Sequence, residues 1–429
     1  MESIPLSAIA LFTFLFCLLS RRIIDSWITA PMAFTGLGLL LSDVSLGMFA
    51  PHLRSHLVTV IAEITLILVL FSDASRICAA RLRHDGALPL RLLALGLPLT
   101  IIIGTIIAML LPLGLGIWEA ALLAVVLAPT DATLGQAILT IKSIPLRIRQ
   151  ALNVESGLND GIALPVLLMF LVLATDGTSG DLGTSIYLIV KQIVLGVLAG
   201  ISIAFLGSRA FDWFGSRGWM SGDFERISVF ALALLTYAGA EVIGGNGFIA
   251  AFCAGLTVGN ISRRMPRCIV SFVETEGQLF TLAIFFLFGV SMAAPALAAV
   301  DLPIITYALL SLTLIRMVPV ALALKGVHFR WDTILILGWL GPRGVASILY
   351  LLILIEHKDE HAILGLNTIE AVAVLTVLLS ILLHGISAKP LANLYSRRIN
   401  KKTDLPEHGP FSGHKKAENG SQQNGQNNT

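Results

Sequence analysis

Charged residues are scarce in this sequence: they make up 13% of its 429 residues, and the net charge is only +2. Soluble domains carry about 25% charged residues, so this composition excludes an ordinary soluble protein. Hydrophobic residues reach 56%, and the mean hydropathy is +0.85. We therefore expect a protein that crosses the lipid bilayer many times. The small net charge, spread over short loops, also excludes the strongly basic surface that is typical of nucleic-acid binding.

Cysteine is equally scarce. The chain has no C-x-x-C pair and no histidine at ligand spacing from a cysteine. We interpret its cysteines as small buried hydrophobic residues, and we expect neither a transition metal nor any cofactor. These residues are Cys17, Cys78, Cys253 and Cys268.

Long apolar runs dominate what is present. Since a helix needs about 20 residues to cross a bilayer, the sequence predicts an all-α fold with thirteen transmembrane segments. The first run is followed by Arg21 and Arg22 instead of being preceded by basic residues, so we interpret it as a transmembrane helix rather than a signal peptide. The approximate segments are 4–19, 27–42, 57–75, 87–112, 117–140, 150–174, 184–207, 224–243, 247–260, 272–295, 302–324, 332–354 and 364–387.

The distribution of basic residues predicts an orientation. Lysine and arginine follow the odd-numbered segments, whereas the loops after the even-numbered segments carry almost none. The positive-inside rule then places the N-terminus outside and the C-terminus in the cytoplasm. The polar sequence after Lys389 predicts a disordered cytoplasmic tail, and so short a tail fits a prokaryotic inner-membrane protein.

Two segments are interrupted in their middles. The fifth contains "LAPTDATLG" and the twelfth contains "WLGPRGVAS", and their odd separation gives them opposite orientations, as an inverted repeat requires. Pro129 and Pro342 each remove a backbone donor. Ordinary proline kinks are the alternative. The charges beside the prolines, Asp131 and Arg343, favour two broken helices that cross near the middle of the membrane.

The sixth segment carries two acids in "NVESGLNDGIALP", residues 153–165. A carboxylate at this depth costs about 2.5–3.5 kcal/mol, which indicates a functional site. On a helix, Glu155 and Asn159 share one face, whereas Ser156 and Asp160 share another. We expect Glu155 to face a neighbouring helix. Its expected partner is Arg316 in the eleventh segment, in an ion pair that joins two helices; direct binding of an ion is the alternative.

The other face predicts a cation site. Asp160, Thr130 and Ser156, with a carbonyl freed by the fifth-segment interruption, form the all-oxygen ligand set of a hard cation, and we expect an alkali cation here. Asp131 is expected to reach the same cavity. Asp73 is a candidate second carboxylate; an ion pair with the nearby Arg76 is the alternative.

Together, "PTD", "VESGLNDGIA", the intramembrane arginine and "GPRGVAS" resemble the NhaP/NHE branch of monovalent cation:proton antiporters across most of residues 1–390. The resemblance implies Asp160 as the ion- and proton-binding carboxylate and Thr130 and Asp131 as residues of an unwound helix. It also implies Glu155 and Arg316 as a buried pair. Relatives more often have "GLRG" where this chain has Pro342 before Arg343. We expect Asp131 beside the positive N-terminus of a half-helix and Arg343 beside a negative C-terminus; a snorkelling anchor is the alternative for Arg343.

The resemblance further implies a homodimer of two-domain protomers with NhaA/NHE-like inverted repeats. Its expected organisation is dimerisation-domain helices in 1–85 and 224–300, core-domain helices in 86–183 and 301–389, a linker helix in 184–223 and a tail in 390–429.

The function expected from these features is exchange of Na⁺, or of Li⁺ or K⁺, for H⁺. The two ions compete for Asp160, because deprotonation creates the cation site and protonation destroys it. Asn159 is neutral and is expected to hydrogen-bond locally, so a single exchangeable charge predicts electroneutral one-for-one exchange. The alternatives are a transporter of the same fold for K⁺ or an organic anion, and an intramembrane enzyme that uses Asp131 and Asp160 as an aspartyl pair.

Overall fold

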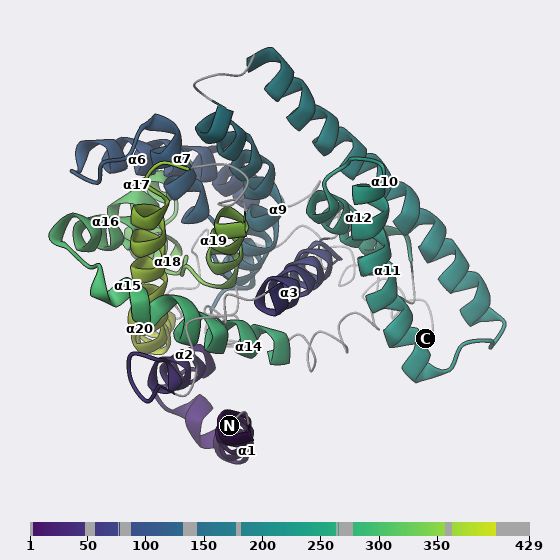
Figure 1. The fold of residues 1–429 in the computed structure, drawn as a ribbon, viewed down its shortest axis with the longest axis horizontal. Helices are drawn as coiled ribbons and strands as arrows, with labels where there is room; N and C mark the ends of the chain where they lie inside the picture. The colour runs from purple at the N-terminus through teal and green to yellow at the C-terminus, as the bar shows by residue number, and fades with distance from the viewer. Residues whose placement is uncertain are drawn as a thin grey trace, which may run out of the picture.

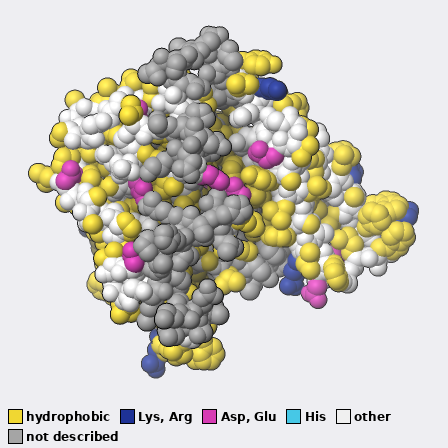
Figure 2. All heavy atoms as spheres, viewed as in Figure 1, with side chains coloured by type: hydrophobic (Ala, Val, Ile, Leu, Met, Phe, Trp, Pro, Cys, Tyr) yellow, Lys and Arg dark blue, Asp and Glu magenta, His cyan; other side chains and the backbone are white. Residues whose placement is uncertain are grey.

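The computed structural model describes residues 3–47, 56–75, 77, 87–131, 144–176, 182–262, 265, 278–356 and 363–399. All regular structure within these ranges is helical (Figure 1). Charged side chains are few among the hydrophobic ones on the face shown in Figure 2. Length and composition allow six described helical runs to cross a membrane: Leu88–Leu110, Arg147–Thr175, Val190–Ser216, Leu279–Ala298, Leu302–Ala323 and Leu366–Ile399. The predicted all-α polytopic fold is confirmed, whereas the count of thirteen spans stays a prediction.

The N-terminal part of the chain forms the helices that contain the first interruption and the two intramembrane acids. They are α1 (Ser3–Asp25), α2 (Ala30–Leu41), α3 (His56–Ser75), α5 (Ala87–Arg91), the π-helical turn η2 (Leu92–Gly96), α6 (Leu97–Leu110), α7 (Ile117–Val126) and α9 (Leu146–Asp176). The long helix α9 contains Pro165 without ending there.

The C-terminal part contains the second interruption. Its elements are α10 (Leu182–Ser216), α11 (Gly222–Val242), α12 (Gly247–Ile261), α14 (Gln278–Phe288), the π-helical turn η4 (Gly289–Ala293), α15 (Ala294–Ala298), α16 (Leu302–Leu312), α17 (Leu314–Ala323), α18 (Trp331–Trp339), α19 (Val345–Glu356) and α20 (Leu366–Ile399). The sequence predicts one uninterrupted span over 302–324, but the helix is interrupted at Thr313, and Arg316 therefore lies in the first turn of a separate helix.

The helices gather into two packed groups. Buried side chains of α3, α10, α11 and α12 form one hydrophobic cluster, on the right of Figure 1. Those of α6, α7, α9, α16, α19 and α20 contribute to the main core. Helix α3 also contacts α9 and α19, so it links the two groups. The predicted core and dimerisation domains stay a prediction, as does their assembly into a dimer.

Small residues bring α12 and α3 close together. A side chain at Gly255 would collide with the backbone of Phe71, and one at Gly259 would collide with the backbone of Ser75. Because lipid tails are as apolar as leucine, helices in membranes associate by such close packing.

The prediction of a disordered tail from residue 390 is wrong for its first ten residues. Helix α20 continues to Ile399, so residues 390–399 are helical, and the rest of the predicted tail lies outside the described residues. Tyr395 is buried, and its hydroxyl oxygen lies 2.9 Å from Oγ1 of Thr333. Burial of this side chain outweighs the backbone donor that Pro390 removes.

Both predicted interruptions are present. Helix α7 ends at Val126 and the described chain runs on without helix to Asp131; α18 and α19 are separated by residues 340–344. The second is a true break and not a proline kink, because its residues leave the helical hydrogen-bond pattern. The residues that follow the first, 132–143, lie outside the described ranges.

Candidate cation site

The two breaks are joined through their backbones. The amide of Asp131 donates to the carbonyl of Pro342 over 2.8 Å. The carboxylate of Asp131 also accepts from the amide of Val345, the first residue of α19, over 2.8 Å. A carboxylate at a helix N-terminus satisfies an unpaired donor and the positive end of the helix dipole. Asp131, which the sequence assigned to the ion site, therefore has one oxygen engaged in capping α19.

Arg343 occupies the opposite electrostatic position. Its Nη1 donates to the carbonyls of Gly341 over 3.2 Å and of Pro129 over 3.4 Å, beyond the C-terminal ends of α18 and α7. The side chain is completely buried, with 0% of its surface exposed. The alternative of a snorkelling anchor is therefore wrong, since a snorkelling side chain keeps its charged end in water.

Two glycines allow these contacts, and the sequence analysis did not single them out. A side chain at Gly341 would collide with Arg316 and with Thr130, whereas one at Gly344 would collide with the carboxylate of Asp131. The signal was present as G-x-x-G around Pro342, but sequence alone does not say what approaches each glycine.

Asn159 connects α9 to the first break. Its side-chain amide donates to Oγ1 of Thr130 over 2.6 Å, and the same hydroxyl lies 3.3 Å from Oγ of Ser156. All three side chains are buried. The expectation of a local hydrogen bond for Asn159 is wrong: the partner is 29 residues away, because the unwound segment supplies a hydroxyl at that point.

Asp160 lies next to this cluster with an uncommitted carboxylate oxygen. Its side chain is 7% exposed, and Oδ1 has no hydrogen-bond partner among the described residues; the same holds for Oδ1 of Asn159. Leaving such oxygens unpaired in a membrane interior is costly. The charges of Asp73 and Asp131 act on Asp160, which places three carboxylates in one region. The region therefore combines excess negative charge with free oxygen ligands.

Asp73 lies on α3 and is half-buried. Its charge acts on Asp160, so the fold brings the two predicted carboxylates into the same neighbourhood. The alternative partner, Arg76, lies outside the described residues.

Tyr350 is a neighbour of Asp160 that the sequence analysis missed. It is fully buried on α19, and its hydroxyl donates to the backbone carbonyl of Asp160. This bond ties α19 directly to α9 at the acidic residue. Nothing in the sequence marks this tyrosine, since aromatic residues are common in apolar helices.

The predicted pair of Glu155 and Arg316 is present. Nη2 of Arg316 and Oε1 of Glu155 lie 2.6 Å apart, and both side chains are almost fully buried. The pair joins α17 to α9 on the face of α9 that the helical spacing predicted. Each residue neutralises the other in a place where a lone charge would be expensive.

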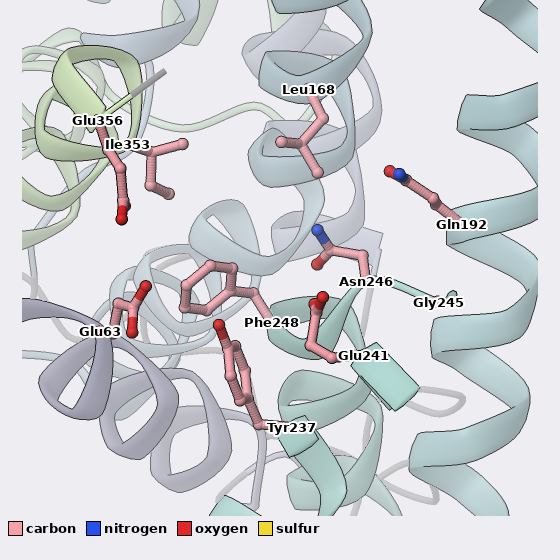
Figure 3. A pocket seen from close by; sticks show the side chains of 10 residues that line it. All are labelled: Glu63, Leu168, Gln192, Tyr237, Glu241, Gly245, Asn246, Phe248, Ile353 and Glu356. Atoms are coloured by element: carbon pink, nitrogen blue, oxygen red, sulfur yellow. The ribbon is translucent and has the colours of Figure 1, made fainter. Parts of the chain in front are cut away.

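A polar cavity of about 310 Å³ lies between α3, α9, α10, α11, α12 and α19 (Figure 3). The side chains of Glu63, Tyr237 and Glu241 project into it, and Glu356 reaches it from the end of α19. Leu168 also lines it, two helical turns beyond Asp160 on α9. Within the described residues, no group of three or more His, Cys, Asp or Glu side chains has the geometry to hold a metal ion. The cavity is therefore a polar space lined by the carboxyl side chains of Glu63, Glu241 and Glu356.

The chain is similar to known proteins in both sequence and fold. The family model described as "Sodium/hydrogen exchanger, transmembrane" matches residues 8–394. The K⁺/H⁺ antiporter NhaP of Alkalimonas amylolytica is 26% identical over 411 residues, which are 94% of this chain and 69% of that protein. The K⁺/H⁺ antiporter NhaP2 of Shewanella oneidensis is 25% identical over 295 residues, 67% of this chain and 48% of that protein.

A solved structure shares the fold. The sodium proton antiporter MjNhaP1 from Methanocaldococcus jannaschii superposes with a TM-score of 0.74 and 21% identity, over 92% of this chain and 100% of that one. An identity this low indicates a shared arrangement of helices and carries no information about the transported ion.

Proposed function

Because this chain belongs to the sodium/hydrogen exchanger family, we propose that it exchanges Na⁺ for H⁺ across the membrane, with Asp160 as the group for which both ions compete. The predicted family is confirmed, and so is the prediction of a transporter rather than an enzyme. The alternative of an intramembrane aspartyl enzyme is therefore wrong. The names of the relatives and of the structural neighbour support cation:proton antiport as the main function.

The observation that carries the proposal is the uncommitted, buried carboxylate oxygen of Asp160. A proton or a small cation neutralises this carboxylate, but both cannot occupy it together. The empty carboxylate is a bare charge that resists passage through an apolar barrier. Transport in one direction is thereby coupled to transport in the other.

Neighbouring oxygens complete the proposed cation site. The hydroxyls of Thr130 and Ser156 and the amide oxygen of Asn159 are the proposed further ligands. Asn159 adjoins Asp160 in the chain, Ser156 lies one turn before it on α9, and Thr130 contacts both Asn159 and Ser156. Hard cations accept such oxygen ligands. Asp73 is proposed as a second carboxylate that increases the attraction for a cation.

The remaining charged residues hold the site in shape. Asp131 caps α19 and Arg343 lies near the C-terminal ends of α7 and α18, so these three described half-helix ends meet an opposite charge. Glu155 and Arg316 form a neutral pair that joins α9 and α17. These four residues support the site without taking part in the exchange of charge.

A single exchangeable carboxylate favours electroneutral one-for-one exchange. Asn159 occupies the position beside Asp160 and carries no charge. Bound to H⁺ or to Na⁺, Asp160 has the same net charge, so the membrane potential does no net work on the cycle.

Na⁺, Li⁺ and K⁺ are all candidate cations. The similar curated proteins are named as K⁺/H⁺ antiporters, whereas the structural neighbour is named as a sodium proton antiporter. We place Na⁺ first because a site with several closely packed oxygens suits a small ion, and K⁺ is the second candidate. An organic anion is disfavoured by the acidic side chains at Asp160 and around the polar cavity.

We propose a homodimer in a prokaryotic inner membrane, with the N-terminus outside and the C-terminus in the cytoplasm. The alternation of basic loops supports the orientation. In this orientation the polar cavity opens toward the outer side, because it is lined by Asn246 in the loop between α11 and α12.

The deciding experiment compares the wild-type protein with Asp160→Asn in sealed proteoliposomes with an imposed pH gradient. We expect Na⁺-driven proton movement in the wild type and its loss, by at least about a hundredfold, in the variant, since an amide neither binds nor releases a proton. Asp301→Asn is the matched control, because Asp301 is an exposed N-cap of α16 and asparagine caps a helix equally well. Persistent exchange in correctly folded Asp160→Asn would overturn the proposal.

A further inference from the structure

His384 is a buried histidine that the exchange mechanism above does not use. It lies on α20 with 1% of its surface exposed, against the break between α18 and α19. Its ring is stacked on Trp339, the last residue of α18, with 4.9 Å between the ring centroids.

Both backbone groups at the edges of this break bond to α20. Nε2 of His384 lies 2.8 Å from the carbonyl oxygen of Trp339, and the amide of Arg343 donates to Oγ of Ser380 over 2.6 Å. A carbonyl only accepts, so Nε2 of His384 is the donor. In a continuous α-helix, the carbonyl of Trp339 would accept from the amide four residues later, which is that of Arg343. Helix α20 therefore replaces both halves of one of the hydrogen bonds that the break removes.

The two replacement groups are themselves in contact. Nδ1 of His384 lies 3.0 Å from the carbonyl oxygen of Ser380 and 3.4 Å from its Oγ. On the same turn of α20, the hydroxyl of Ser380 accepts from the amide of Arg343. His384 and Ser380 thus lie together on α20, one bonded to the carbonyl of Trp339 and the other to the amide of Arg343.

These contacts lead directly to the cation site. The residue before Arg343 is Pro342, whose carbonyl accepts from the amide of Asp131. Asp131 adjoins Thr130, which bonds to Asn159 beside Asp160. Holding the amide of Arg343 and the carbonyl of Trp339 apart therefore fixes the backbone on which the cation ligands depend.

We propose that His384 and Ser380 form a clamp on α20 that keeps the α18–α19 helix open at its break, and that His384 is a positioning residue of the transport site. The clamp deepens the proposed cation exchange and rests on it. Its expected effect is on cation affinity rather than on the presence of exchange, because neither residue touches Asp160.

The test compares variants that keep or lose the donor at the Nε2 position. His384→Gln places an amide N–H at a similar reach, whereas the shorter side chain of His384→Asn does not reach Trp339. In proteoliposomes we expect the KM for Na⁺ to rise about tenfold in His384→Asn, with the maximal rate within about threefold of wild type. His384→Gln should return the KM to within about threefold of wild type.

Ser387→Ala is the matched control. Ser387 lies one turn along α20 and accepts from the indole N–H of the same Trp339 over 2.9 Å, but it contacts neither backbone group of the break. We expect a KM near that of the wild type. An equal rise in Ser387→Ala and His384→Asn would overturn the clamp, since general packing against Trp339 would then explain both.

A second measurement does not depend on transport. Hydrogen–deuterium exchange of peptides that contain residues 339–345 reports on the amide of Arg343. We expect faster exchange in Ser380→Ala than in the wild type and unchanged exchange in Asp160→Asn. If the wild-type protein showed no ion exchange, the proposed function would be contradicted, but the deuterium exchange of Ser380→Ala would still test the clamp. Equal deuterium uptake in wild type and Ser380→Ala would overturn the clamp even if transport is normal.

Discussion

At the scale of single residues, the site depends on which buried charges are paired and which are not. Glu155 and Arg316 neutralise each other, Asp131 caps a helix, and Arg343 bonds to carbonyls. Asp160 keeps an uncommitted oxygen in the same region. Burial raises the cost of every unpaired charge, so Asp160 has a strong need for a proton or a cation.

The buried pair makes a sharp prediction about stability. We expect Glu155→Gln or Arg316→Met each to lower the free energy of unfolding by about 3–5 kcal/mol, because each leaves the other charge buried and alone. The double variant should cost less than the sum of the two. Thermal unfolding of detergent-solubilised protein measures this coupling.

The control for this prediction is the exposed pair of Arg330 and Asp332, whose side chains are 35% and 21% exposed. Asp332→Asn should change stability by no more than about 1 kcal/mol, as surface ion pairs do. Strictly additive effects of Glu155→Gln and Arg316→Met would show that the two residues act independently.

At the scale of helices, the molecule brings two broken spans together by removing side chains where backbones and charges must approach. Gly344 faces the carboxylate that caps α19, and Gly341 faces Arg316 and Thr130. The proline between these glycines has no amide to donate, but its carbonyl receives the amide of Asp131. At this break, glycines leave room for the neighbouring charged side chains, and backbone groups of one broken span bond to the other.

Gly344→Ala tests this junction. The added methyl group would collide with the carboxylate of Asp131 and disturb the cap of α19. We expect a loss of exchange activity of tenfold or more, about the effect of losing an N-cap of 1–2 kcal/mol. Initial rates of Na⁺-dependent proton movement in proteoliposomes provide the measurement.

Gly36→Ala is its control, since nothing lies near the position of a side chain at Gly36 on α2. Alanine should be tolerated there and should favour the helix slightly. If both variants lost activity to the same degree, the effect would come from glycine replacement in general and not from contact with Asp131.

At the scale of the whole molecule, the orientation of the protein in the membrane decides which loops and which cavity face the outside. The polar cavity and the loop between α11 and α12 are expected to face outward, and the loop between α17 and α18 is expected to face the cytoplasm. The alternation of basic loops predicts this orientation, and labelling of single residues tests it.

Single cysteines supply that test in a variant whose four native cysteines have been replaced. The exposed Ile243 and the exposed Lys325 lie in the two loops. In intact cells, a membrane-impermeant maleimide should label Ile243→Cys at once and Lys325→Cys only after the membrane is opened. The reverse pattern would invert the topology and place the cavity on the cytoplasmic side.

The sequence by itself determined the membrane-embedded helical fold, the two interruptions and most of the residues around them. Hydrophobic runs report burial in lipid directly, and helical spacing placed Glu155 and Asp160 on different faces. The π-helical turns, the interruption at Thr313 and the extension of α20 beyond Pro390 escaped prediction, because they depend on what packs against each helix.

The pairing of Glu155 with Arg316 was predicted from the sequence, but only the tertiary structure decided the partners of the other polar groups at the site. Asn159 bonds to a hydroxyl on another segment, and Arg343 bonds to two carbonyls. Tyr350 and His384 bond to backbone carbonyls near the site, although no sequence motif marks either residue. The physical reason is that hydrogen bonds require distances and directions, which are set by residues far apart in the chain. The sequence predicts that a charge is buried, and the fold determines which group pairs with it.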